Sequence, residues 1–284
     1  MTQAADLASG KGHTDENFPV ASVLIAPEHR APVLAFYRFA RIADDVADNA
    51  QAAVADKLAL LETMRATLAG DSDASPESLA LRRVCAEKKL SIQHGVDLLE
   101  AFRRDVTKLR YVDWNDLMDY CRYSAMPVGR FVLDVHGESQ TTWPANDALC
   151  AALQIINHLQ DCAKDFRFLD RVYIPQGALA AAGITVEDLD KPRSSPALLS
   201  VIRDLARQTK DLLAEAKIFS SQIRDKRLAL EVAVIQRLAE DLIQRLLTRD
   251  PLSDKVHHSK VQAAMLAAAS LPGYALNRFR RPAA

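Results

Sequence analysis

The segment that most constrains the architecture of this chain is Tyr37-Arg38-Phe39-Ala40-Arg41-Ile42-Ala43-Asp44-Asp45-Val46-Ala47-Asp48. It predicts the C-terminal half of a helix that begins near Glu28 and ends around Asn49. At roughly 100° per residue, Arg41, Asp44 and Asp48 lie within about 40° of a line through the tyrosine. The other faces are largely apolar, so the helix is predicted to be buried. Acids on such a helix need a metal ion, an arginine network or both to neutralise them.

A second segment repeats this arrangement, and it reads Leu153-Gln154-Ile155-Ile156-Asn157-His158-Leu159-Gln160-Asp161-Cys162-Ala163-Lys164-Asp165. On a helix, Gln154, Asn157, Asp161 and Asp165 align within about 60°. In both segments the last two acids of the line are four residues apart, and hydrogen-bonding side chains precede them. We name these lines the first stripe (Tyr37, Arg41, Asp44, Asp48) and the second stripe (Gln154, Asn157, Asp161, Asp165). The matched pattern is consistent with two stripes that face one another across a cavity.

The bulk composition narrows the class of protein. A chain of 284 residues with 49% hydrophobic content and only 9 glycines favours a compact, mostly helical protein. A net charge of −1 argues against a nucleic-acid partner. No apolar run approaches the length of a transmembrane helix, and the N-terminus lacks a signal-peptide core. The four cysteines lack the spacing of a metal site and are expected to be buried thiols, which favours a reducing cytoplasmic location. Peripheral contact with a membrane stays open.

The rest of the chain predicts helices and no strand. Residues 1–16 are expected to form a flexible tail, and residues 17–284 a single all-α domain. The further expected helices are 52–69, one that begins at Ser75-Pro76-Glu77, one capped by Ser91, 113–137 with a kink at Pro127, one after Trp143-Pro144, 176–182, 197–219, 228–248 and 259–271. A polar loop is expected at 184–196.

A single Asp-x-x-x-Asp pair would ordinarily indicate a solvated helix surface. Here the pair occurs twice, and each time it continues a polar line along an otherwise apolar helix. Opposed carboxylate pairs suit Mg²⁺, which takes oxygen ligands and bridges to substrate phosphates. The chain has neither a Walker loop nor a GxGxxG motif. His13 and His158 are predicted to be hydrogen-bonded structural residues, and His257-His258 are placed in an exposed loop without a role.

Taken together, these segments resemble the squalene/phytoene synthase family, whose members have the all-α isoprenoid synthase fold with a central cavity. The resemblance is carried by Tyr37-x-x-x-Arg41-x-x-Asp44-Asp45-x-x-Asp48, by Tyr120-Cys121 with Val128-Gly129, by Gln154-x-x-Asn157-x-x-x-Asp161-x-x-x-Asp165, by Arg171-Val172-Tyr173-Ile174-Pro175 and by Asp250-Pro251-Leu252. The motifs up to Pro175 lie in family order and cover most of residues 17–175, and the Asp250-Pro251-Leu252 segment also fits.

Within this family, two segments resemble the bacterial branch that converts presqualene diphosphate to hydroxysqualene in hopanoid biosynthesis. They are Glu16-Asn17-Phe18-Pro19-Val20-Ala21-Ser22 and Ser124-Ala125-Met126-Pro127-Val128-Gly129-Arg130. Relatives that condense two prenyl diphosphates usually carry Arg where this chain has Gln160. Loss of that cation fits a substrate with a single diphosphate.

The resemblance also implies roles for individual residues. It implies Mg²⁺ held by Asp44, Asp48, Asp161 and Asp165. It implies catalytic roles for Tyr37, Arg41, Asp45, Tyr120, Asn157 and Tyr173, and substrate binding by Phe18, Arg41, Val128, Gly129, Gln154, Asn157 and Arg171. Diphosphate departure leaves a carbocation that water captures, so no nicotinamide cofactor is expected. Two alternatives stay open: a family member that makes presqualene diphosphate or phytoene from two prenyl diphosphates, and a catalytically silent scaffold protein.

Overall fold

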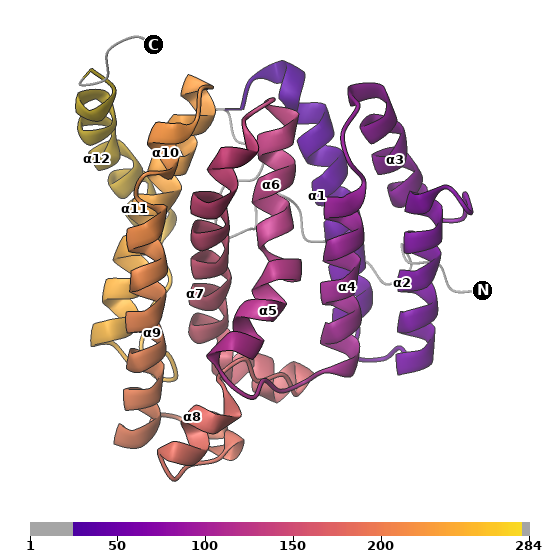
Figure 1. The fold of residues 1–284 in the computed structure, drawn as a ribbon. Coiled ribbons are helices and arrows are strands. Elements are labelled where there is room, and N and C mark those ends of the chain that lie inside the picture. Colours follow the sequence, from indigo (N-terminus) through magenta and orange to yellow (C-terminus); the bar gives the residue numbers. More distant parts are fainter. Residues whose placement is uncertain (1–24, 280–284) are drawn as a thin grey trace. The chain divides into compact units, whose positions relative to one another are not determined.

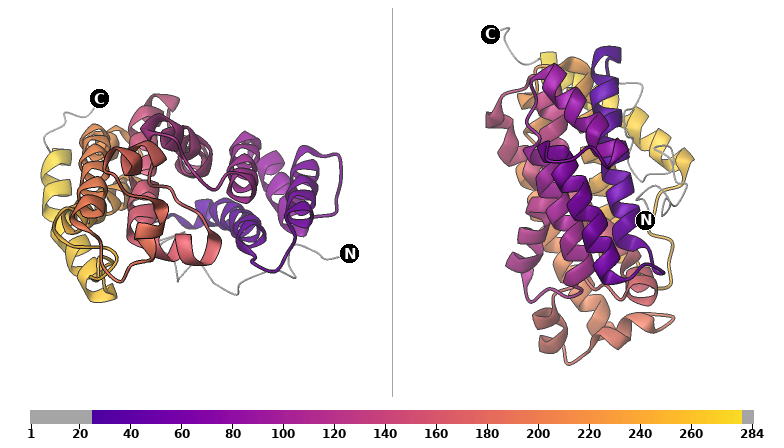
Figure 2. Two further views of the ribbon diagram at one scale, coloured as in Figure 1. Left: turned by 90° about the horizontal axis from the view of Figure 1, so that it is seen from below. Right: turned by 90° about the vertical axis from the view of Figure 1, so that its right-hand side faces the viewer.

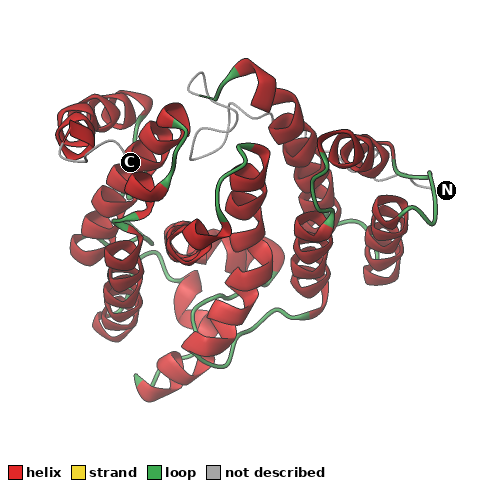
Figure 3. Cartoon of the chain, turned by 45° about the horizontal axis from the view of Figure 1, so that its top comes forward, coloured by secondary structure: helices red, strands yellow, loops and turns green. Residues whose placement is uncertain are grey.

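The computed structural model describes residues 25–279, and every regular element within them is a helix (Figures 1 and 3). The elements are α1 (Pro27–Asp48), α2 (Val54–Ala69), α3 (Pro76–Lys88), α4 (Gln93–Thr107), α5 (Trp114–Ser124), α6 (Met126–Val135), η2 (Gln140–Thr142), α7 (Trp143–Leu169), α8 (Gln176–Ala181), η3 (Val186–Asp190), α9 (Pro196–Ala216), α10 (Phe219–Gln222), α11 (Lys226–Thr248) and α12 (Lys260–Phe279). Among the described residues, β-pairing is limited to one isolated bridge between Arg110 and Val172. The predicted all-α class is therefore confirmed.

Several helices begin and end where local chemistry requires it. Ser75 caps α3 by accepting a hydrogen bond from Ser78 N, and Ser195 does the same for Leu198 N at the start of α9. Asp225 caps α11, because its carboxylate accepts from two backbone N–H groups of the first turn. Gly70 ends α2 at a φ of 100°, a left-handed conformation that costs glycine little.

The chain forms two compact units. The first unit runs to Leu109 and includes Asp119–Ser139, and the second consists of Arg110–Met118 and the residues from Gln140 onward. The sequence-based prediction of a single domain over residues 17–284 remains a prediction. None of the described helices combines the length and apolar character that crossing a bilayer requires.

The first unit is built around α1, which packs against α3, α4 and α6 (Figure 2, indigo to magenta). Phe36 of α1 stacks on Phe131 of α6, with ring centroids 4.2 Å apart. Phe39 and Met64 are fully buried in the same core. Because these apolar residues turn one side of α1 inward, the first stripe lies on another side of the helix.

The second unit is built around α7, which packs along α9 and α11. The apolar face of α7 is fully buried at Ile155, Ile156 and Leu159. The helix ends at Leu169, and Asp170 adopts a left-handed conformation at a φ of 51°. Residues 171–175 then return the chain beside Tyr111, whose carbonyl accepts a hydrogen bond from Gln176 N at 2.8 Å.

The structure corrects three details of the predicted elements. The predicted kink at Pro127 is a break between two helices, α5 and α6, because Ala125 leaves the helical region with φ −126° and ψ −47°. Ser91 does not cap α4, which starts at Gln93, although its hydroxyl accepts from Gln93 N. The expected loop at 184–196 contains the helical turn η3, which a capping box at Thr185 stabilises.

Candidate active site

The first stripe is organised by Arg41. Its Nη1 lies 3.0 Å from Asp44 Oδ2, and its Nε donates to Asp45 Oδ1 at 3.1 Å. Both contacts follow from helical spacing, because residues three and four positions apart share a face. The Arg41 side chain is 17% exposed, so the ion pairs are partly shielded from water. One guanidinium is thus shared between two carboxylates.

The pKa of Asp44 shows that Arg41 only partly compensates for the charge of this carboxyl group. Its pKa is raised to about 8, because burial disfavours the charged form and Asp48 repels it, while Arg41 only partly compensates. Asp105 and Asp45 add further repulsion. The Asp44 side chain nevertheless keeps 34% of its surface exposed, so a ligand can reach it. Without a cation, this carboxyl group holds its proton at neutral pH.

Asp45 is not part of the first stripe and lies on a buried face of α1. It is 4% exposed and holds Arg41 through both Nε and Nη2. Its predicted catalytic role remains a prediction, and the geometry gives it the function of orienting the guanidinium. A buried carboxylate in this role is costly to remove, since the arginine would lose one of its two carboxylate partners.

Tyr120 and Asp105 form a buried pair beside this stripe. The Tyr120 hydroxyl donates to Asp105 Oδ2 at 2.9 Å, and the two residues are 2% and 5% exposed. Sequence reasoning missed Asp105, although it affects the pKa of Asp44. The available signal was an acid on the apolar face of α4, between Phe102 and Val106.

The predicted substrate-binding residues of α6 lie at its first turn. Val128 is 40% exposed, and Gly129 is half-buried beside it. Tyr37 of the first stripe is also half-buried. Phe18, the remaining predicted substrate-binding residue of this part of the chain, lies outside the described residues.

The second stripe is organised by His158. Its Nε2 lies 3.0 Å from Gln154 Nε2, and its Nδ1 lies 3.9 Å from Asp165 Oδ2. Its ring stacks on Tyr173 at 3.4 Å between centroids, and Tyr173 in turn stacks on Tyr111. The predicted hydrogen-bonded role of His158 is what the structure shows. Tyr173 is 7% exposed, so its position is fixed by the two rings that cover it.

The remaining predicted residues of the second unit separate into half-buried and buried groups. Asn157, Asp161 and Asp165 are half-buried, as Gln154 is. Arg171 is 6% exposed at the start of the returning segment. Gln160 is also 6% exposed, and neither atom of its side-chain amide has a hydrogen-bond partner among the described residues. A buried amide without partners is costly, so this position is a candidate for contact with a ligand or a water molecule.

His257 and His258 lie in a loop, as predicted, but both are half-buried rather than exposed. The His258 side chain is 9% exposed and contacts Asp241 Oδ2 at 2.8 Å. The His257 Nε2 lies 3.5 Å from Asp161 Oδ1 of the second stripe. The signal was weak, since two adjacent histidines after a polar stretch resemble any solvated linker.

The donor set of each stripe fits Mg²⁺. Each stripe supplies two carboxylates one helical turn apart, and Asp44 carries a proton that a cation would replace. Within residues 25–279, three or more His, Cys, Asp or Glu side chains nowhere gather into a ready metal cage. Mg²⁺ commonly binds through one or two carboxylates, several waters and substrate phosphate, so such a cage is not needed. The two stripes belong to different units, and their facing one another remains a prediction.

Comparison with known proteins gives consistent results. A family model described as squalene/phytoene synthase matches residues 11–280. The chain is 56% identical over 272 residues to the hydroxysqualene synthase of Zymomonas mobilis, and the alignment covers 95% of this chain and 92% of that protein. It is 55% identical over 262 residues to the hydroxysqualene synthase of Rhodopseudomonas palustris, with coverage of 92% and 90%. The solved squalene synthase HpnC from Alicyclobacillus acidocaldarius is similar at a TM-score of 0.69 and 27% identity, with coverage of 96% and 93%.

Proposed function

Because the chain belongs to the squalene/phytoene synthase family, we propose that it acts as a hydroxysqualene synthase, which converts presqualene diphosphate and water to hydroxysqualene and diphosphate. The single observation that carries this proposal is an identity of 48–56% with three hydroxysqualene synthases over nearly the whole chain. The phytoene synthase of Arabidopsis thaliana is 32% identical over 61% of this chain. The branch predicted from Glu16–Ser22 and Ser124–Arg130 is therefore confirmed.

In this reaction, the bond between the substrate carbon and the diphosphate oxygen breaks, and both electrons leave with diphosphate. Water then adds to the rearranged carbocation and loses a proton, so the products are an alcohol, diphosphate and one proton. Asp44 and Asp48 together with Asp161 and Asp165 would hold Mg²⁺ for the diphosphate. Bound Mg²⁺ supplies positive charge that stabilises the leaving group.

Arg41 would contribute to the same task. Its guanidinium is held by Asp45 and lies 3.0 Å from Asp44, so its position is fixed before substrate binds. A fixed cation costs little reorganisation when negative charge develops on the departing group. Arg171, which is 6% exposed, would add charge from the second unit.

Tyr37, Tyr120, Asn157 and Tyr173 remain the candidates for guiding water to the cation and lining its surroundings. Two of them are constrained by observed contacts. Tyr120 donates its hydroxyl proton to Asp105 at 2.9 Å, which fixes where its oxygen lies. Tyr173 presents an aromatic ring held between Tyr111 and His158.

Gln160 supports a substrate with one diphosphate. A neutral, buried amide stands where condensing relatives usually carry a cation, and its two polar atoms have no hydrogen-bond partner among the described residues. A second diphosphate would bring negative charge that this position cannot balance. An amide can instead hydrogen-bond water or the single diphosphate.

The decisive experiment is product analysis by mass spectrometry. Purified protein with Mg²⁺ should consume presqualene diphosphate and give little product from farnesyl diphosphate alone. Reaction in ¹⁸O-labelled water should place the label in the product hydroxyl, and NADPH should change neither rate nor product. Efficient formation of presqualene diphosphate or phytoene from two prenyl diphosphates would favour the condensing alternative. Absence of turnover with every diphosphate would favour the scaffold alternative.

We also propose that the protein works in the reducing cytoplasm. Cys85, Cys121, Cys150 and Cys162 are all outside disulfide bonds, and all but Cys150 are buried. Burial raises the pKa of Cys162 to about 12, so its thiol stays protonated and unreactive. Fractionation of cells that express the protein would test this location and any peripheral membrane contact.

A further inference from the structure

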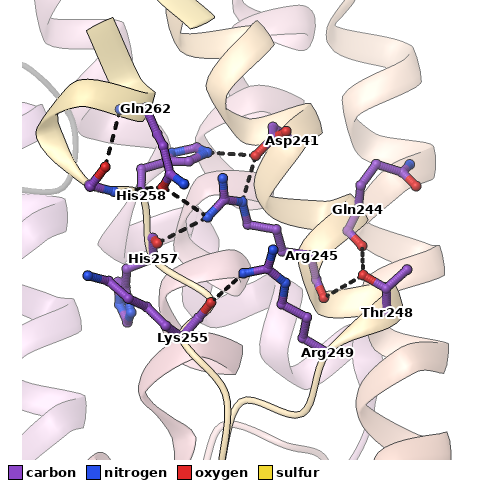
Figure 4. A network of polar contacts seen from close by, with 10 residues as sticks. Asp241, Gln244, Arg245, Thr248, Arg249, Lys255, His257, His258 and Gln262 are labelled. Carbon is purple, nitrogen blue, oxygen red and sulfur yellow. Dashed lines mark hydrogen bonds and ion pairs between the residues drawn. The ribbon is translucent and has the colours of Figure 1, made fainter. Parts of the chain in front are cut away.

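The segment between α11 and α12 is held in place by side chains of α11 (Figure 4). Asp241 accepts hydrogen bonds from Arg245 Nε at 2.7 Å and from His258 Nε2 at 2.8 Å. Burial alone would raise the pKa of Asp241, but the hydrogen bonds from His258 and Arg245 outweigh it and the pKa is lowered. The carboxylate therefore stays charged and can hold both donors.

Arg245 of α11 and Arg249, which directly follows this helix, also fix the backbone of the segment. Arg245 Nη1 donates to the carbonyl oxygen of His257 at 3.2 Å, and Arg249 Nη1 donates to that of Lys255 at 2.7 Å. Charge-assisted hydrogen bonds of this kind are stronger than neutral ones. A backbone held at residues 255 and 257, with His258 anchored as a side chain, has little freedom to turn His257 elsewhere.

The His257 side chain is directed away from the Asp241 cluster (Figure 4) and toward α7. Its Nε2 lies 3.5 Å from Asp161 Oδ1, and the two side chains keep 37% and 32% of their surface exposed. This distance is within ion-pair range but slightly longer than a hydrogen bond. Both groups therefore remain accessible to a ligand. A small rotation of the carboxylate would bring its oxygen into hydrogen-bond range of the imidazole.

We infer that His257 is a positioning residue for Asp161: its imidazole engages one carboxylate oxygen and turns the other toward the bound cation. This inference rests on the proposed function, in which Asp161 is a ligand of Mg²⁺. A carboxylate has two oxygens, and a donor on Oδ1 fixes the plane of the group while Oδ2 stays free. Partners of this kind around metal ligands typically change metal affinity by about 10–100-fold when they are removed.

The pairing has a counterpart on the same helix. Asp165 lies 3.9 Å from His158 Nδ1, so each acid of the second stripe faces a histidine nitrogen. His158 comes from α7 itself, whereas His257 comes from a segment nearly one hundred residues later in the chain. The network of α11 is thus what connects this distant segment to the candidate metal site.

The test measures binding of Mn²⁺ to the protein without substrate, by counting free Mn²⁺ with electron paramagnetic resonance. His257→Ala should weaken Mn²⁺ binding by about 10-fold. His257→Asn, which keeps an N–H donor, should recover part of the loss and serves if the alanine variant does not fold. The matched control is Lys255→Ala, which removes a nearby positive charge on an exposed side chain and should leave Mn²⁺ affinity as in the wild type.

A second arm tests the network. Asp241→Asn weakens the hold on His258 and Arg245, so it should lower Mn²⁺ affinity in the same direction. The double variant Asp241→Asn/His257→Ala should bind no more weakly than His257→Ala alone, because both changes act through one contact. Fully additive losses would overturn the inference.

Two results distinguish failure of the proposed role of His257 from failure of the proposed metal site. If Asp161→Asn weakens Mn²⁺ binding while His257→Ala does not, the positioning role is wrong and the metal site stands. If Asp161→Asn binds Mn²⁺ as the wild type does, both the positioning role of His257 and the assignment of Asp161 as a metal ligand are wrong. A direct imidazole nitrogen coupling in the electron spin echo spectrum of bound Mn²⁺, lost in His257→Ala, would make His257 a ligand and overturn the positioning role.

Discussion

Replacing the proton on Asp44 by a divalent cation should be measurable directly. In the metal-free protein the pKa of this carboxyl group is about 8, so at pH 7 about nine-tenths of the molecules carry its proton. A metal ligand must be deprotonated. Saturation with Mg²⁺ at pH 7 should therefore release about 0.9 proton from Asp44, and at pH 9 only about 0.1. Below pH 8, the apparent affinity should fall by up to about tenfold for each pH unit.

The sign of the stability effect follows from the same shift. The pKa of Asp44 is raised above its usual value of 3.8, so the folded protein binds this proton more tightly than the unfolded chain does. Asp44 therefore costs no stability below pH 3.8, and its cost grows as pH rises toward 8. A cation bound to the charged form offsets that cost. Added Mg²⁺ should accordingly raise the melting temperature more at pH 8.5 than at pH 6.

The assay is calorimetric titration with Mg²⁺ in buffers of different ionisation enthalpy, which reports the number of protons released. Asp44→Asn is the test variant and should release about one proton fewer than the wild type at pH 7. Asp73→Asn, which replaces an exposed acid in the loop before α3, is the matched control and should release as many protons as the wild type. Release that does not change between pH 7 and pH 9, or that persists in Asp44→Asn, would refute the reasoning.

Three further predictions follow from individual contacts. Asp161→Asn should reduce turnover of presqualene diphosphate by on the order of 10²-fold or more, with a circular dichroism spectrum and melting temperature near wild type; a loss of fold instead would make this acid structural. Tyr120→Phe should lower the free energy of unfolding by about 1–3 kcal/mol in denaturant titrations, because buried Asp105 loses a donor; an unchanged value would mean that water replaces the hydroxyl. Lys89→Gly should raise that free energy by about 1 kcal/mol without affecting activity, since Lys89 ends α3 at a φ of 54°, and a destabilised variant would contradict this.

The sequence predicted the fold class because the helices obey local rules. Pro27, Ser75 and Gly70 mark helix ends through their own backbone chemistry, and the structure places the ends there. The break before α6 was harder to predict. Pro127 indicates a disturbed helix in any context, but whether the chain kinks or stops depends on what packs around Ala125.

The candidate site was predictable where it lies along one helix and not where it depends on distant segments. The alignment of Asp161 and Asp165 follows from a spacing of four residues. The contact between Asp161 and His257 joins positions 96 residues apart, and no local pattern encodes it. Asp105 is an intermediate case, because its place on an apolar helix face is visible but its effect on Asp44 requires the packing of α4 against α1.

The two stripes neutralise their acids differently, and this difference bears on how each unit would use a cation. In the first stripe, Asp44 and Asp45 compete for one guanidinium, and Asp44 keeps its proton until a cation arrives. In the second stripe, each acid faces a histidine, whose imidazole carries charge only when protonated. At Asp44 the shortage of positive charge is therefore present before any ligand binds. A protein that had no cation to bind would gain stability by replacing these acids with apolar residues, which is why the retained carboxylates favour an enzyme over a silent scaffold.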